Sequence, residues 1–406
     1  MPRIAGIIAN LVPYHHARWE AYARLSGADI HLVALTERDP FKALEYNPDN
    51  GSQSYLQHTL FKGSHGEALS KKTLRHRLFE ALDAINPDVL CVSGWGLPFS
   101  LAAINWAILK GVPIVMLSES NEFDEVRSFI KEYIKRRIIS LCSAGLAGGS
   151  PQAEYLVKLG MPKGMVFQGY DVVDNSYFLR AAEVSRVSSR GISQNYFLAC
   201  ARFGRKKNLS GLLRAYALYR KELITSSNDR ISTTALPDFD LIIAGDGEER
   251  AHLEKTIREC GISNHVHLVG AKGYEELPFY YAHAGAFIHA STTEQWGLVV
   301  NEAMASGLPV LVSNRCGCAK DLVQDGVNGW TFDPADEGRM ADLMKIVVVN
   351  EDQRLRMGVK SREMISEWGP ERFARGIDSA VNAAFSSPVK NSSFVDRLMI
   401  QALSQC

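Results

Sequence analysis

Two carboxylates, Glu294 and Glu302, lie in a segment whose pattern places them beside an expected anion-binding site. Residues 286–312 read as a strand, a polar loop, a helix, a glycine stop and a second strand. Gly297 allows close backbone approach, and the helix is expected to begin near Leu298. Amide groups at a helix start favour an anion, typically a phosphate. Because carboxylates accept hydrogen bonds from a vicinal diol, the segment suits a ligand with hydroxyls beside phosphates.

A second candidate for anion binding is the basic run after the first strand of the second half of the chain. Arg202 ends this strand and Lys207 opens the next helix, so both are expected at one edge of the sheet. Two cations there can neutralise a diphosphate. Spacing alone leaves plainer interpretations open. The run can be a solvated basic loop, above all at Arg205 and Lys206, and Glu302 can be a residue of the helix surface.

The elements that must position these residues are strands and amphipathic helices in alternation, which predicts βαβ units and parallel sheets. The expected strands are 3–9, 30–35, 88–92, 113–118, 144–148, 165–169, 196–200, 239–244, 265–269, 286–290 and 309–313. A polar stretch at 185–191 reads as a linker. We therefore predict an α/β fold of two doubly wound, Rossmann-like domains at 1–185 and 192–384, with a helix in 385–406 packing back on the first. Such sheets bind ligands at the carboxyl ends of their strands, and the cleft between two domains is the natural site.

The composition of the 406 residues excludes several classes of protein. Lys and Arg number 45, as do Asp and Glu, so bulk charge does not favour a nucleic-acid partner. Apolar runs are far shorter than the ~20 residues of a membrane span, and the N-terminus reads as a strand rather than a signal peptide. Seven scattered cysteines fit reduced thiols better than a disulfide framework. These features predict a cytoplasmic protein.

Motifs of several other enzyme classes are absent from the sequence. There is no P-loop, no G-x-S-x-G elbow and no H-E-x-x-H metal motif. Gly6 stands alone in the first strand-to-helix turn, and Gly245-Asp246-Gly247 follows a strand without the third glycine of a dinucleotide fingerprint. A nicotinamide enzyme is therefore disfavoured.

Taken together, the segment resembles the retaining glycosyltransferases of family GT4, which have the GT-B fold. The resemblance is carried by Glu294-x7-Glu302 within Glu-Gln-Trp-Gly-Leu…Asn-Glu-Ala-Met-Ala-Ser-Gly-Leu-Pro-Val. Arg202, Lys207 and Gly245-Asp246-Gly247 join it at the spacing of the family. It covers residues 195–384 strongly and is mainly architectural over 1–185.

The resemblance implies that the C-terminal domain binds a nucleoside-diphosphate sugar without a metal or other cofactor. Arg202 and Lys207 would hold the diphosphate, Glu302 the ribose hydroxyls and Glu294 the donor sugar. Further donor contacts are implied for the backbone of Gln295, Trp296, Gly297 and Leu298, for Gly245, and for His267 within a 266–270 segment lying against the base. The implied reaction transfers a sugar with retention at the anomeric carbon.

The N-terminal half departs from the family pattern. Residues 10–16 replace a paired glycine in the first loop, and Glu119 stands near the place of a usual histidine. Glu119 is a candidate for binding a donor or acceptor hydroxyl, or is a loop carboxylate without a ligand. His15 and His16 are candidate acceptor contacts or plain helix-start residues. Trp95 is a candidate sugar-stacking platform or a core residue.

The acceptor is open from sequence: a sugar, a lipid-linked molecule or a small molecule each fits. Segment 125–142 has apolar residues at helical spacing and a basic side, which suits either an anionic membrane surface or a core-packed helix with a solvated face. We favour the core-packed helix, and peripheral contact with the inner face of the membrane is the alternative.

Three hypotheses for the function follow from the resemblance. The first is a transferase using a UDP- or GDP-sugar in polysaccharide or glycoconjugate biosynthesis. The alternatives are a non-catalytic sugar-nucleotide-binding partner of a glycosyltransferase and a sugar-nucleotide 2-epimerase of the same architecture.

Overall fold

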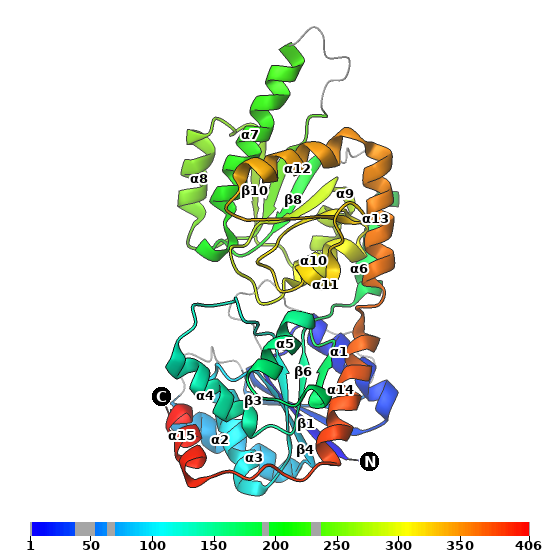
Figure 1. Cartoon of the computed structure of the whole chain (residues 1–406). Coiled ribbons are helices and arrows are strands. Elements are labelled where there is room, and N and C mark those ends of the chain that lie inside the picture. The colour runs from blue at the N-terminus through cyan, green and yellow to red at the C-terminus, as the bar shows by residue number, and fades with distance from the viewer. Residues whose placement is uncertain (1, 37–52, 63–69, 189–194, 229–236, 406) are drawn as a thin grey trace. The chain divides into compact units, whose positions relative to one another are not determined.

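The computed structural model describes residues 2–36, 53–62, 70–188, 195–228 and 237–405, which form two compact units. Unit 1 comprises residues 1–173 and 369–406, and unit 2 comprises residues 174–368 (Figure 1). Each unit is a parallel sheet covered by helices, so the predicted α/β, doubly wound fold class is confirmed.

Unit 1 contains a seven-stranded sheet in the order β3-β2-β1-β4-β5-β6-β7. Its strands are β1 (Arg3–Asn10), β2 (Asp29–Thr36), β3 (Leu56–Phe61), β4 (Val89–Ser93), β5 (Ile114–Ser118), β6 (Ala144–Ala147) and β7 (Val166–Gln168). Its helices are α1 (Pro13–Ser26), α2 (Lys71–Ile85), α3 (Pro98–Lys110), α4 (Phe129–Ser140), α5 (Ser150–Lys158), α14 (Pro370–Phe385) and α15 (Phe394–Gln405). β3 is an edge strand whose apolar and polar residues are all at least partly exposed. The sequence analysis did not predict it, because it lacks a buried apolar run.

Unit 2 contains a six-stranded sheet in the order β10-β9-β8-β11-β12-β13. Its strands are β8 (Tyr196–Cys200), β9 (Asp240–Ala244), β10 (Val266–Gly270), β11 (Ala286–His289), β12 (Val310–Ser313) and β13 (Gly329–Phe332). Its helices are α6 (Asn175–Ser188), α7 (Leu209–Asn228), α8 (Arg250–Glu259), α9 (Leu277–His283), α10 (Leu298–Ala305), α11 (Ala319–Leu322), α12 (Glu337–Val349) and α13 (Glu351–Ile365). β13 also went unpredicted; it begins at Gly329, where a Cβ would lie 1.8 Å from the Val310 carbonyl oxygen.

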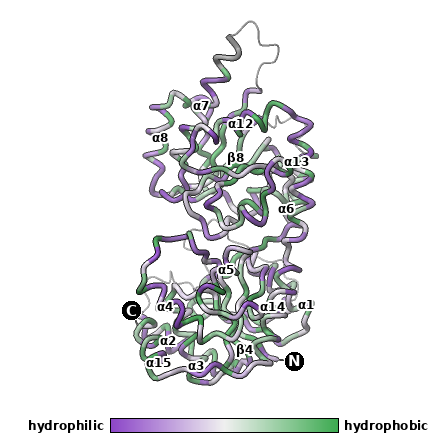
Figure 2. Tube along the Cα trace, in the orientation of Figure 1, coloured by the Kyte–Doolittle hydropathy of each residue, from purple (hydrophilic) through white to green (hydrophobic). Residues whose placement is uncertain are grey.

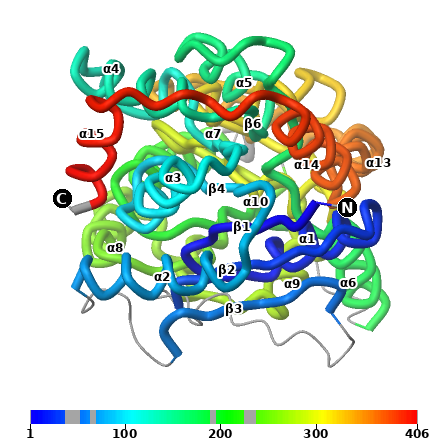
Figure 3. The backbone as a smooth tube through the Cα atoms, turned by 90° about the horizontal axis from the view of Figure 1, so that it is seen from below, coloured from blue at the N-terminus to red at the C-terminus, as the bar shows by residue number. Residues whose placement is uncertain are grey.

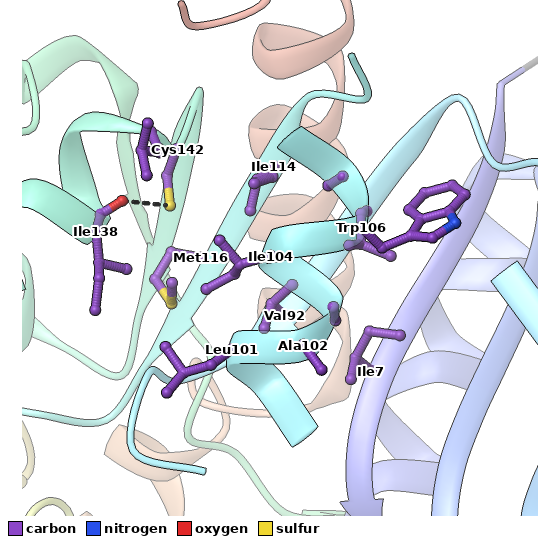
Figure 4. Close-up of a cluster of buried hydrophobic side chains, with 14 of the residues drawn as sticks. Ile7, Val92, Leu101, Ala102, Ile104, Trp106, Ile114, Met116, Ile138 and Cys142 are labelled. Carbon is purple, nitrogen blue, oxygen red and sulfur yellow. Dashed lines mark hydrogen bonds between the residues drawn. The ribbon is translucent and has the colours of Figure 1, made fainter. Parts of the chain in front are cut away.

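The core of unit 1 explains why α3 is apolar on all sides. One side of α3 packs against the sheet, where Ile104 lies toward Val92 and Met116 (Figure 4). Trp106 points elsewhere and donates its indole N–H to Asp83 of α2 at 2.9 Å. Its outer side is covered by α15, whose Ile400 is fully buried in the same cluster. A helix that is apolar all round requires such cover on both sides.

The unit boundaries differ from the predicted domains at 1–185 and 192–384. The polar stretch predicted as a linker is helical up to residue 188, and Arg186 donates to the Ala282 and Ser306 carbonyls at 2.9 and 2.6 Å. These bonds tie α6 to unit 2. α14 was predicted in the second domain, but it packs on α1, β6 and β7, so it belongs to unit 1.

The two C-terminal helices complete unit 1. In α14, Phe373 meets the ring of Trp19 from α1 at a centroid distance of 5.5 Å. α15 lies against α3 and α4, as Figure 3 shows, and Arg137 of α4 pairs with Asp396 at 2.5 Å. The last segment of the chain therefore supports the sheet formed by the first.

Most covering helices turn their apolar side toward a sheet, but the start of α4 exposes apolar residues. Hydrophilic and hydrophobic residues alternate along the traces of covering helices such as α4 and α8 (Figure 2). α4 begins at Phe129, later than the helix predicted within 125–142, and several apolar residues at its start are exposed. No helix of the described residues is both long and apolar enough to cross a bilayer.

Close packing of α14 generates a stability prediction. A Cβ on Gly376 would lie 2.4 Å from the Gln168 carbonyl oxygen, so we expect Gly376→Ala to lower the free energy of unfolding by about 1–3 kcal/mol. Gly338→Ala in α12 is the matched control, because its Cβ meets only an Asp336 oxygen at 3.5 Å. Urea unfolding measures both. Equal stabilities would contradict the placement of α14 on β7.

Candidate functional site

Three loops at the carboxyl ends of neighbouring strands interlock in unit 2. Thr292, after β11, donates its backbone N–H to the Lys206 carbonyl after β8 at 2.8 Å. Glu294 donates its backbone N–H to the Arg315 carbonyl after β12 at 3.2 Å and accepts from Gly317 at 3.0 Å. The loops after β8, β11 and β12 are thereby held at one edge of the sheet, which we call the cationic edge: Arg202, Lys206, Lys207, Glu294 and Arg315.

The Glu294 carboxylate is the centre of this edge. It forms an ion pair with Lys207, and its oxygens lie 3.7 Å from Lys206 Nζ and 3.6 Å from His289 Nε2. Burial alone would raise the pKa of Glu294, but the contacts with His289 and Lys207 outweigh it and hold that pKa well below its usual range. Glu294 is therefore charged at neutral pH, and an incoming anion must compete with its carboxylate for the Lys207 side chain.

Glu302 lies in α10, whose first residue is Leu298 as expected. Gly297 precedes the helix with φ of +109°, a left-handed conformation that favours glycine. The Glu302 carboxyl is buried and accepts a hydrogen bond from the Tyr281 hydroxyl at 2.8 Å. Burial raises the pKa of Glu302 to about 7. It is therefore not the surface residue that spacing alone allowed.

Trp296 and Gly245 have structural roles near the cationic edge. The Trp296 indole is buried, donates to Asn301 Oδ1 at 2.9 Å and lies 5.2 Å from the ring of Trp368. Only its backbone is at the loop, next to the exposed Gln295. A Cβ on Gly245 would lie 1.8 Å from the Ala201 carbonyl oxygen, so the chain itself requires this glycine. Both positions thus have a structural explanation.

The placement of His267 corrects the prediction that it lies against the base. Its Nε2 lies 3.1 Å from Asp240 Oδ2, at the start of β9 and thus at the amino ends of the strands. There it lines a cavity of about 520 Å³ with Asp238 and His265. The side chain on an edge strand turned toward the nearest carboxylate, which the sequence could not show.

The same amino-end cavity contains the one group of described residues whose spacing could fit a metal ion. Ligand atoms of Asp238, Asp240 and His265 lie within 4.8 Å of one another. Arg220 contacts Asp238 and lies 2.9 Å from His265 Nε2, while His265 Nδ1 faces Asp240 at 3.0 Å. The charges and hydrogen-bonding groups of this cavity are thus paired with one another, and they lie at the opposite end of the strands from the cationic edge.

Unit 1 brings a second charged cluster to the carboxyl ends of its strands. Arg18 of α1 is fully buried, lies 3.8 Å from Asp171 and is within about 5 Å of the rings of Tyr14 and Tyr170. Burial, and then the charge of Glu119, raise the pKa of Asp171, whereas Arg18 opposes them. Glu119 directly follows β5 and is half-buried. It is therefore electrostatically linked to a buried ion pair rather than an isolated loop carboxylate.

The histidine and tryptophan candidates lie at the same edge of unit 1. His15 Nδ1 accepts from the Val12 N–H at 3.3 Å, and burial lowers its pKa well below the usual value. His16 contacts the Tyr55 hydroxyl, and burial lowers its pKa as well. Trp95 is half-buried and packs against the core. His15 thus has a helix-capping role, and all three remain candidates for ligand contact.

Sequence reasoning missed four residues of these clusters: His289, Tyr281, Arg18 and Asp171. His289 ends β11, five residues before Glu294, so its strand-end position could have identified it. Tyr281, Arg18 and Asp171 carry no sequence signal, because their importance comes from burial beside another charged or titratable group.

Comparison with known families assigns the larger part of unit 2. Residues 183–364 match the family model described as "Glycosyl transferases group 1". This range, which covers most of unit 2 but less than half of the chain, is therefore similar to the group 1 glycosyltransferases. The matched range includes the whole cationic edge together with Glu302.

Curated relatives that match the same part of the chain are named for different sugars. A GDP-mannose-dependent alpha-(1-6)-phosphatidylinositol monomannoside mannosyltransferase of Mycobacterium tuberculosis is 31% identical over 169 residues, covering 36% of this chain and 44% of the relative. An alpha-monoglucosyldiacylglycerol synthase of Acholeplasma laidlawii is 32% identical over 150 residues, covering 36% and 34%. The matches thus span less than half the length of these relatives.

Solved structures share the fold over most of the chain. Anabaena HepE in complex with UDP-glucose aligns with a TM-score of 0.72 at 16% identity, covering 94% of this chain and all of that one. At this identity the likeness concerns the fold alone.

The buried Glu302 carboxyl predicts a pH-dependent stability. Its folded pKa of about 7 exceeds the ordinary 4.5, so the folded state holds a proton that the unfolded chain releases. Relative to Glu302→Gln, the wild type should lose stability as pH rises from about 5 to about 8. Thermal unfolding of both proteins across this range tests it. Parallel curves would show that Glu302 does not titrate in the folded protein.

The burial of Arg18 predicts which variants of unit 1 lose the most unfolding free energy. Arg18→Met leaves Asp171 and Glu119 without their buried cation, and should cost about 3–5 kcal/mol of unfolding free energy. Asp171→Asn should cost clearly less, since the amide keeps the shape of the side chain and Arg18 keeps its hydrogen bond to the Val172 carbonyl. Arg24→Met, at an exposed site of α1, is the control and should change stability by less than about 0.5 kcal/mol. If denaturant unfolding shows Asp171→Asn to be less stable than Arg18→Met, Arg18 does not compensate the carboxylates as described.

Proposed function

We propose that the chain is a glycosyltransferase that transfers a sugar from a UDP- or GDP-sugar to a hydroxyl acceptor in polysaccharide or glycoconjugate biosynthesis. The observation that carries the proposal is the cationic edge within the range that matches the group 1 glycosyltransferases. There Lys207 forms an ion pair with Glu294, in the loop that leads into α10. The names of the curated relatives and the fold shared with HepE support the same class of reaction.

The donor roles follow from the charges at the edge. Lys207, with Arg202 in the same loop, neutralises the diphosphate, and the first amides of α10 add a partial positive charge. When the diphosphate takes the Lys207 ammonium, the Glu294 carboxylate becomes available to a donor-sugar hydroxyl. Glu302 binds the ribose hydroxyls, with Tyr281 holding its carboxyl in place.

We propose that the reaction is metal-independent and proceeds with retention. Fixed cations and helix amides can stabilise a leaving diphosphate in the way a divalent ion otherwise does. A transition state with oxocarbenium character needs such leaving-group stabilisation more than a strong nucleophile. Departure of the diphosphate toward Lys207 and attack by the acceptor on the same face retain the anomeric configuration.

The acceptor side is proposed to lie at the carboxyl ends of the unit 1 strands. Glu119, backed by Asp171 and Arg18, has a carboxylate suited to a sugar or acceptor hydroxyl. His15 and Trp95 lie at the same edge and complete the polar and flat surfaces that carbohydrate binding uses. The acceptor is a hydroxyl-bearing sugar, lipid-linked molecule or small molecule.

Donor binding tests this proposal. UDP- and GDP-sugars are added to the full chain in EDTA, and the melting temperature is measured. A ligand that binds only the folded state must raise it. We expect a shift with one nucleotide class. In Lys207→Ala the donor affinity should fall by at least about tenfold, because a charge facing the diphosphate is lost.

The control is Lys255→Ala, since Lys255 is an exposed lysine of α8 that pairs with Glu259 in its own helix. It should bind donor like the wild type. An unchanged donor affinity in a folded Lys207→Ala protein would refute the diphosphate site. A shift that requires a divalent ion would refute metal independence, and a product of inverted configuration would refute retention. Donor binding without transfer to any acceptor would favour the non-catalytic partner.

A further inference from the structure

The first two turns of α4 and the segment just before it, at Val126, expose large apolar side chains. Val126 is 92% exposed, Phe129 87% and Ile130 69%. Later in the same helix Ile138 is only 2% exposed. The apolar spacing that favoured a core-packed helix therefore serves two purposes: its second half packs on the core, and its first half faces solvent.

A second exposed apolar group lies on the neighbouring helix α15. Phe394 is 75% exposed, Val395 63% and Leu398 50%. The ion pair between Arg137 and Asp396 fixes the start of α15 beside α4. The two groups together form what we call the apolar patch: Val126, Phe129, Ile130, Tyr133, Phe394, Val395 and Leu398. Isolated exposed apolar residues are ordinary, but a set on two adjoining helices indicates an interaction surface.

Within α4 the basic residues outnumber the acidic ones by four to one, and Lys131 pairs with Glu125 at 3.7 Å. Between residues 125 and 140 there are five basic and two acidic side chains. Both acids are engaged by interior partners: Lys135 contacts Glu125 at 2.5 Å and Glu132 at 3.2 Å, and Arg127 also contacts both. Their negative charge is thus largely neutralised. The basic residues exposed around the patch are Lys131, Arg136, Lys390 and Arg397.

We propose that the apolar patch docks unit 1 on the surface of an anionic lipid bilayer. Phe129, Ile130 and Phe394 would enter the boundary between headgroups and acyl chains, and Lys131 and Arg136 would bind lipid phosphates. Apolar side chains rimmed by cations match such a surface, whereas a protein partner would need acidic groups around its own apolar face. The proposal adds a location to the proposed function but does not depend on it.

The test is sedimentation of the full chain with vesicles of phosphatidylcholine, with and without phosphatidylglycerol. We expect binding to the anionic vesicles that weakens with added salt. Phe129→Ser with Ile130→Ser should reduce binding by roughly tenfold or more, since two inserted apolar side chains are lost. Lys131→Glu with Arg136→Glu should remove the preference for phosphatidylglycerol. Because all four side chains are exposed or at the surface, melting temperatures should stay unchanged.

The matched control is Leu355→Ser, at a 52% exposed leucine of α13 in unit 2, which should bind vesicles like the wild type. Absence of binding to anionic vesicles would overturn the proposal, as would equal binding by the Phe129/Ile130 double variant. Self-association of the wild type that this variant abolishes, without vesicle binding, would overturn it in favour of an interface between copies. Donor-induced thermal shifts are read separately, so failure of the proposed function remains distinguishable.

Discussion

The ion pair between Glu294 and Lys207 is the interaction on which the cationic edge depends. It joins loops that are 87 residues apart in sequence, because β8 and β11 are neighbours in a parallel sheet. Backbone hydrogen bonds to the loop after β12 hold the carboxylate in place. The edge therefore has its positive charges ordered before any anion arrives, which lowers the cost of binding one.

Charge is buried differently in the two units. In unit 2, Glu302 is removed from water with a single hydroxyl partner, and its raised pKa reflects that isolation. In unit 1, Arg18 offsets part of the negative charge of Asp171 and Glu119, and aromatic rings cover the guanidinium. Groups kept in such surroundings cost stability unless paired, and both clusters lie at strand ends where ligands of α/β sheets bind.

The end of the chain is part of unit 1 rather than an appendage of unit 2. α14 covers the sheet beside α1, and α15 covers α3 and contacts α4. The same arrangement brings the two exposed apolar groups onto adjoining helices. Packing of the C-terminal segment thus supports the core of unit 1 and assembles the apolar patch on its surface.

The sequence by itself determined the parallel α/β class, most strands, and the strand-end positions of Lys207 and Glu294, because alternating patterns and strand ends are local signals. Only the structure showed that these two side chains pair. Tertiary structure decided the rest. The burial of Trp296, the orientation of His267 and the exposure of Phe129 depend on which segments pack against them. The unit boundaries differ from the predicted ones for the same reason. The polar stretch that resembled a linker forms the end of α6, and Arg186 there bonds to other residues of unit 2. Periodicity shows that a helix has an apolar face, but only packing shows whether that face is covered.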